Sequence, residues 1–216
     1  MSAPTRPKAF TFDPIAHRYR DGASGRFLSS NAVHGYVVDY SVNVGASMRD
    51  LTQQLRQGAL SVAEWQVRVA AEIKSAHVAA AIAAAGGRDQ MTPSLWGATG
   101  QRIKTEYQFL SAFADGIASG AIPMDGHVLD RTAQYGRDAR ETYWRIMSRE
   151  MVRRGLDEER NVLDPSEHEV CAGCLDATAL EWQRVGTIQP VGSRVPCRAN
   201  CLCSMQYRNS ATGEVR

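Results

Sequence analysis

The sequence predicts a mainly α-helical protein: an elongated bundle of about four long helices, with a short N-terminal β-hairpin before it and a small C-terminal, zinc-ribbon-like α+β module after it. Two observations predict this fold. Apolar side chains recur every three or four residues over four long stretches. All five cysteines then fall in one C-terminal segment. The expected divisions are an N-terminal arm (1–30), a helical bundle (31–155) and a cysteine-rich zinc-binding module (156–216).

The composition is that of an ordinary globular protein, with 44% hydrophobic and 22% charged residues over 216 positions. The net charge of +2 is too small to predict nucleic acid or an anionic membrane as a specific partner. The chain has no apolar run of the length that crosses a membrane, and its first residues lack the apolar core of a signal peptide. We therefore expect a cytoplasmic origin, where clustered cysteines bind metal more often than they form disulfides.

The N-terminal segment "AHRYRDGASGRFLS" predicts the hairpin. Tyr19 and Phe27 lie on either side of "DGASG", whose residues favour a tight turn. An isolated two-stranded hairpin is marginally stable in water. We therefore expect this one to dock on a neighbouring protein, with Tyr19 and Phe27 as its anchors.

The first two helices have clear end signals. The first is expected over about 31–57, with Gly58 at the position that favours glycine after a helix. The second begins at "SVAE", in which Ser61 and Glu64 can form a capping box, and it ends at Gly86. Its second half is rich in alanine, which predicts a close contact between helices.

The third helix begins at "TPSLW", with Thr92 as N-cap and Pro93 in the first helical position, and it ends at Gly120. The fourth is expected over about 125–154, with Gly155 after it. Each helix would be about 38 Å long at about 1.5 Å per residue. Short connections predict that neighbouring helices are antiparallel.

The cysteines follow the pattern C-x2-C, 22 residues, C-x3-C-x-C. Thiolates at such spacings can converge on one tetrahedral zinc ion, and the metal then stabilises a module too small for a large core. The intervening "EWQRVGTIQPVGSRVP" predicts a short strand, a turn and another strand. Four of the following are the expected ligands: Cys171, Cys174, Cys197, Cys201 and Cys203.

The spacing leaves the fourth ligand open. The C-x2-C pair and Cys201 are the firmest candidates, while Cys197 and Cys203 compete for the remaining place. His168 could replace one of them or act in the outer shell. The alternative is two disulfides and a free thiol, but a disulfide within C-x2-C is strained and redox-active.

We expect no enzymatic activity. A nucleobase deaminase needs H-x-E and then P-C-x-x-C, whereas here His168 and Glu169 are adjacent and "PCRANC" has one residue too many. Four protein ligands would close the zinc site, so its role would be structural. Trp182 and Tyr207 are expected to pack around the metal and to serve as further anchors for a partner.

Several segments carry a resemblance to a known family: "RYRD…SGRF", "MTPSLWGATGQRI" and above all "HEVCAGCLD…GTIQPVGS…CRANCLCSMQYR". The last resembles the head morphogenesis family of tailed bacteriophages, the minor head proteins of the phage Mu F type. Members tend to have a C-x2-C and a later cluster ending in C-x-C. Cys197 stands about one residue from the position where the family often has a histidine.

The resemblance implies a non-catalytic component of a phage head or neck. Its partners would be portal, major capsid or neck proteins, and it would act in many copies. It would be made in the host cytoplasm and then enter the virion. The alternative is a zinc-dependent nucleic-acid-binding module, which would need a basic face that a net charge of +2 does not supply.

Overall fold

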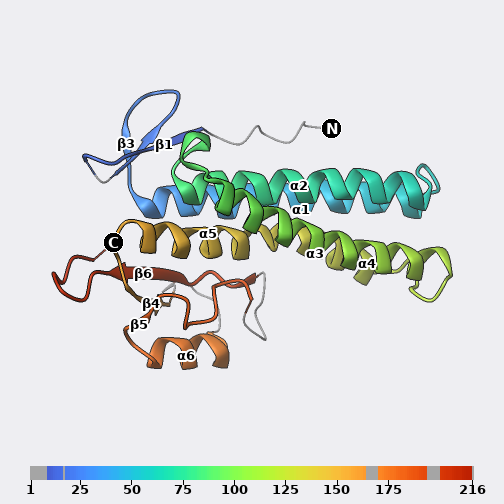
Figure 1. Cartoon of the computed structure of the whole chain (residues 1–216). Helices are drawn as coiled ribbons and strands as arrows, with labels where there is room; N and C mark the ends of the chain where they lie inside the picture. The colour runs from blue at the N-terminus through green and yellow to red at the C-terminus, as the bar shows by residue number, and fades with distance from the viewer. Residues whose placement is uncertain (1–8, 17, 164–169, 194–199, 216) are drawn as a thin grey trace.

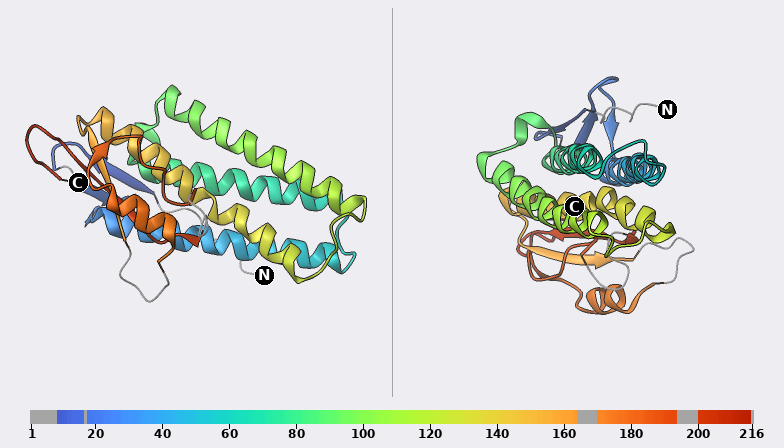
Figure 2. Two further views of the ribbon diagram at one scale, coloured as in Figure 1. Left: turned by 90° about the horizontal axis from the view of Figure 1, so that it is seen from below. Right: turned by 90° about the vertical axis from the view of Figure 1, so that its right-hand side faces the viewer.

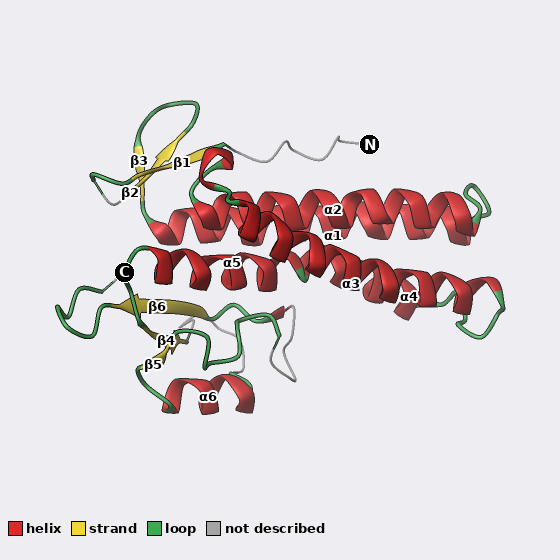
Figure 3. Cartoon of the chain, viewed as in Figure 1, coloured by secondary structure: helices red, strands yellow, loops and turns green. Residues whose placement is uncertain are grey.

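The computed structural model describes residues 9–16, 18–163, 170–193 and 200–215. The chain is mainly helical, with two small antiparallel sheets (Figure 1, Figure 3). Seen end-on, the helices lie between the N-terminal sheet and the C-terminal module (Figure 2). Within the described part, no helix has both the length and the apolar character needed to cross a membrane.

The N-terminal sheet consists of β1 (Phe10–Asp13), β2 (Arg18–Asp21) and β3 (Phe27–Leu28), in that order. The predicted hairpin is confirmed as β2–β3, with Arg20 opposite Phe27. The Asp21 carboxylate closes the turn by accepting hydrogen bonds from the Ala23 and Ser24 amides. A further strand, β1, which no sequence signal predicted, pairs with the other side of β2.

This sheet packs on the chain's own helices, which corrects the expectation for Tyr19. The Tyr19 side chain is 2% exposed, and its hydroxyl lies 3.9 Å from the Met147 sulfur. The Phe12 amide donates to the Gly86 carbonyl at the end of the second helix. Tyr19 is therefore a core residue and offers no surface for a partner. Phe27 remains 38% exposed.

The predicted ends of the first three helices agree with the structure to within a few residues. These helices are α1 (Ser30–Arg56), α2 (Val62–Ala85) and α3 (Pro93–Ala118). The capping box is formed, because the Ser61 hydroxyl accepts from the Glu64 amide and the Glu64 carboxylate accepts from the Ser61 amide. A 3-10 turn, η1 (Arg88–Gln90), precedes α3. The alanines in the second half of α2 are largely buried, as expected.

The fourth predicted helix is two helices, α4 (Gly126–Arg137) and α5 (Ala139–Arg153), divided at Asp138. The Glu141 amide donates to the Asp138 carbonyl, which is the tighter 3-10 pattern. The division lets α4 pack mainly on α1 while α5 packs mainly on α2. Periodicity alone did not reveal it, because the apolar spacing continues across the break.

The C-terminal module has a three-stranded antiparallel sheet in the order β5-β4-β6, joined by one helix. Its elements are β4 (Glu158–Val162), α6 (Ala172–Ala179), β5 (Gln183–Arg184) and β6 (Ser204–Arg208). Of the strand pair expected between the cysteine groups, the described residues contain one strand, Gln183–Arg184. Residues 187–193 form turns and irregular structure, and the end of the expected second strand lies outside the described residues.

The module and the bundle share one continuous cluster of buried residues. Tyr207 is 2% exposed and its hydroxyl lies 3.0 Å from that of Ser148 on α5. It therefore faces the chain's own helix, which corrects its expected role as a surface anchor. Trp182 is partly buried, and the guanidinium groups of Arg160 and Arg208 lie over its ring.

Candidate metal centre

Helix α6 positions the first thiol of the site. Cys171 is the N-cap of this helix, and its carbonyl accepts hydrogen bonds from the amides of Cys174 and Leu175. Cys174 therefore lies in the first turn, with its sulfur buried. The first turn carries the positive end of the helix dipole, which favours a thiolate.

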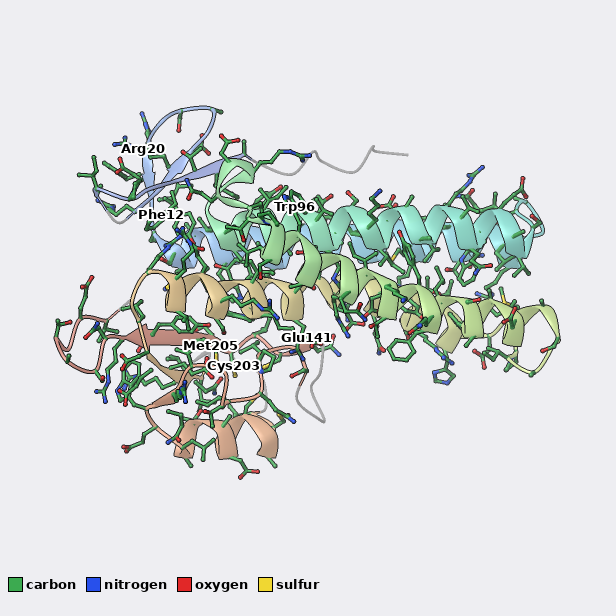
Figure 4. The ribbon with its side chains drawn as sticks, viewed as in Figure 1. Phe12, Arg20, Trp96, Glu141, Cys203 and Met205 are labelled. Atoms are coloured by element: carbon green, nitrogen blue, oxygen red, sulfur yellow. The ribbon has the colours of Figure 1, made fainter. Side chains whose placement is uncertain are left out.

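The other two thiols precede β6. Cys201 and Cys203 are separated by one residue, so in extended backbone their side chains point to the same face. Strand β6 is fixed by pairing with β4 along its whole length. In the view of Figure 4, the labelled Cys203 and Met205 lie inside the C-terminal module, between the helical bundle and α6.

These elements bring Cys174, Cys201 and Cys203 together, with all three sulfurs within 4.8 Å of one another. The Cys174 and Cys201 sulfurs are 3.4 Å apart. In a tetrahedral zinc site with Zn–S bonds of about 2.3 Å, neighbouring sulfurs are about 3.8 Å apart. Three soft donors at this separation fit three of the four positions around zinc.

The other predicted ligands differ in their relation to this three-thiol group. Cys171 is partly buried and lies outside the three-thiol group. Cys203, which was expected to compete for the last position, belongs to the group. Cys197 and His168 lie outside the described residues. None of the four described cysteines forms a disulfide.

In the absence of a metal, deprotonation of one thiol in this cluster is unfavourable. The pKa of Cys201 is raised, chiefly by its hydrogen bond with the Cys203 side chain and then by burial. A thiolate formed here would face two more sulfurs in a medium of low dielectric constant. A bound cation reverses this preference, since it stabilises the deprotonated form. The cluster is therefore suited to releasing protons as it takes up a metal.

Asn161, which no sequence motif indicated, holds α6 on the sheet. Its amide group donates to the Cys174 carbonyl at 3.3 Å and to the Thr178 hydroxyl at 2.7 Å. The Thr178 hydroxyl donates to the same carbonyl. Asn161 is 3% exposed. A buried amide in the middle of β4 thus fixes the backbone of a candidate ligand.

The cysteine turn contacts the bundle near the α4–α5 junction. Arg137 donates to the Asn200 side chain at 2.6 Å, next to Cys201. Arg140 is almost fully buried and donates to the Ser41 hydroxyl on α1. Burial, aided by the charge of Arg137, lowers the pKa of Arg140 to about 10, whereas Cys201 acts to raise it. Positive charge thus lies beside the thiols.

Comparison with known proteins gives no relative from which a function could be transferred. No family model, curated protein or solved structure matches this chain.

Proposed function

We propose that this chain is a non-catalytic structural component of a tailed-phage head or neck. In this proposal a zinc ion cross-links two segments of the C-terminal module. The observation that carries it is the buried group of Cys174, Cys201 and Cys203, which fits three corners of a tetrahedral site. The motif around these cysteines resembles that of the head morphogenesis family.

Zinc would be held by these three thiolates and a fourth ligand, for which Cys171, Cys197 and His168 are the candidates. When bound, the metal would cross-link α6 to the segment before β6. Four protein ligands would leave no open position for a substrate, which supports a structural role. The proposed module resembles a zinc ribbon in one respect: two separate segments of the chain each supply ligands to the same zinc ion.

The proposed partners are portal, major capsid or neck proteins. Phe27 and Trp182 keep exposed surface and remain candidate anchors for such contacts. Aromatic side chains supply much of the binding energy in protein interfaces. The chain would act in many copies, in the host cytoplasm during assembly and then in the virion.

The test is mass spectrometry of purified virions and proheads from the phage or prophage that encodes the chain. The proposal expects the chain in at least one of these particles, at a fixed ratio to the portal protein. Absence from both, with the portal protein readily detected, would show that the structural role is wrong. Presence in proheads alone would define an assembly factor that leaves before maturation.

A further inference from the structure

A groove of about 390 Å³ lies between α3, α5 and the loop at 186–190 of the C-terminal module. It is separate from the three thiols, none of which lines it. Its polar lining comes from three arginines, with hydroxyl and amide side chains around them: Gln101, Arg102, Thr105, Thr142, Arg145, Ser148 and Arg149.

Two of the arginines are held by a buried carboxylate. Glu141 is 5% exposed and accepts from Arg102 at 3.1 Å and from Arg145 at 2.6 Å. Arg102 also pairs with Glu106 at 2.6 Å. Each of these guanidinium groups has five N–H donors, so most of them remain available. The carboxylates therefore orient the arginines without using up their hydrogen-bonding capacity.

Arg149 leaves the groove with surplus positive charge. It is exposed and makes no ion pair among the described residues. Three guanidinium groups thus face two carboxylates. Burial also raises the pKa of Glu106, so burial disfavours the negatively charged form of this carboxylate. Arginines arranged in this way favour an anion with several oxygens.

Apolar residues also line the groove, and two of them come from the C-terminal module. These residues are Ala98, Ile146, Ile188 and Pro190. The loop that carries the last two is fixed by Glu159, whose carboxylate accepts from the amides of Gly186 and Ile188 at 3.0 Å each. A fixed apolar wall beside a cationic wall suits a ligand with an anionic group on an organic body.

We propose that this groove binds a phosphate ester of nucleotide size. Its phosphates would lie on Arg102, Arg145 and Arg149, and its organic part on the wall formed by Ile146, Ile188 and Pro190. A single carboxylate has too few acceptor sites for three guanidinium groups, whereas phosphates can engage all three. The net charge of +2 favours a free nucleotide over a nucleic acid as the source. The proposal does not depend on a role in a phage particle.

The test is titration calorimetry of the full chain with ADP, pyrophosphate and adenosine. ADP is expected to bind most tightly, pyrophosphate more weakly and adenosine not at all. Arg149→Ala should weaken ADP binding at least about tenfold. This side chain has no ion pair in the described structure, so the loss would not come from unfolding. Arg68→Ala, which removes an exposed arginine on α2, is the matched control and should leave binding unchanged.

A second variant tests the apolar wall. Ala98→Phe should weaken ADP binding and leave pyrophosphate binding unchanged, because it fills only the organic side of the groove. A short single-stranded oligonucleotide identifies the source of the phosphate. Tighter oligonucleotide binding that is lost in Arg149→Ala would keep the site and assign it to nucleic acid. Absence of binding by ADP, pyrophosphate and oligonucleotide, or equal losses in Arg149→Ala and Arg68→Ala, would overturn the proposal.

Discussion

Gly136 of α4 lies directly against the backbone of Gly45 in α1. A Cβ atom added to Gly136 would be 2.6 Å from the Gly45 nitrogen, and one added to Gly45 would be 2.9 Å from the Ala133 carbonyl oxygen. The two helices therefore approach more closely than side chains would allow. The contact anchors α4 just before the break at Asp138.

The variant Gly136→Ala is expected to separate α1 from α4. Such overpacking should lower the free energy of unfolding by about 1–3 kcal/mol, although alanine favours a helix over glycine by about 1 kcal/mol. Urea denaturation followed by circular dichroism measures the change. The control is Gly97→Ala in α3, where an added Cβ meets nothing within 4 Å. Equal effects in the two variants would show that the close approach is absent in solution.

Asn161 is expected to position Cys174 for metal binding. Replacement by leucine removes the donors to the Cys174 carbonyl and the Thr178 hydroxyl, and it should cost about 1–3 kcal/mol of stability. It should also speed the loss of zinc to a chelator by about tenfold or more, as other outer-shell changes do. Arg160→Ala changes the exposed neighbour in the same strand and should leave the rate unchanged. An unchanged rate in Asn161→Leu would refute the positioning role.

His77 should make the fold sensitive to acid. It is fully buried, with its Nδ1 2.6 Å from the Thr142 hydroxyl. Burial, and to a smaller extent the charge of Arg102, lower its pKa from 6.5 to about 3. The unfolded chain therefore binds a proton more readily than the folded chain between these pH values. Stability from neutral His77 is present above pH 6.5 and is lost as the pH falls toward 3, by up to about 1.4 kcal/mol per pH unit.

This prediction is checked by comparing unfolding free energies at several pH values below 6.5. His77→Met replaces the imidazole by an apolar side chain and should flatten the dependence relative to the unchanged protein. His127→Gln removes an exposed histidine and should leave the slope as it is. The same slope in His77→Met and the unchanged protein would mean that other groups control the acid response.

Local signals in the sequence were sufficient for the first three helices. Ser61 with Glu64, and Thr92 with Pro93, mark helix starts through interactions within one turn. The break at Asp138 depends instead on which helix lies opposite each half of the stretch. The spacing of apolar residues does not show which helix packs against each half, so the sequence predicted one long helix.

The roles of single aromatic residues were harder to predict. Tyr19 and Tyr207 come from opposite ends of the chain, yet both line one pocket of about 240 Å³ beside α5. The sequence of a two-stranded hairpin does not show which part of the chain packs over its tyrosine, so the burial of Tyr19 could not be predicted. For the candidate metal site, cysteine clustering identified the region. The grouping of Cys203 with Cys174 depends on the pairing of β6 with β4 and on the amide of Asn161.

The central claim is that the thiol cluster holds one zinc ion. The measurement is elemental analysis of the purified full chain, with zinc X-ray absorption on the same sample. We predict about one zinc per chain, with sulfur ligands at about 2.3 Å, and loss of that zinc in the variant Cys174→Ser. Less than about a tenth of an equivalent of zinc in protein that is folded and has reduced thiols would contradict the claim.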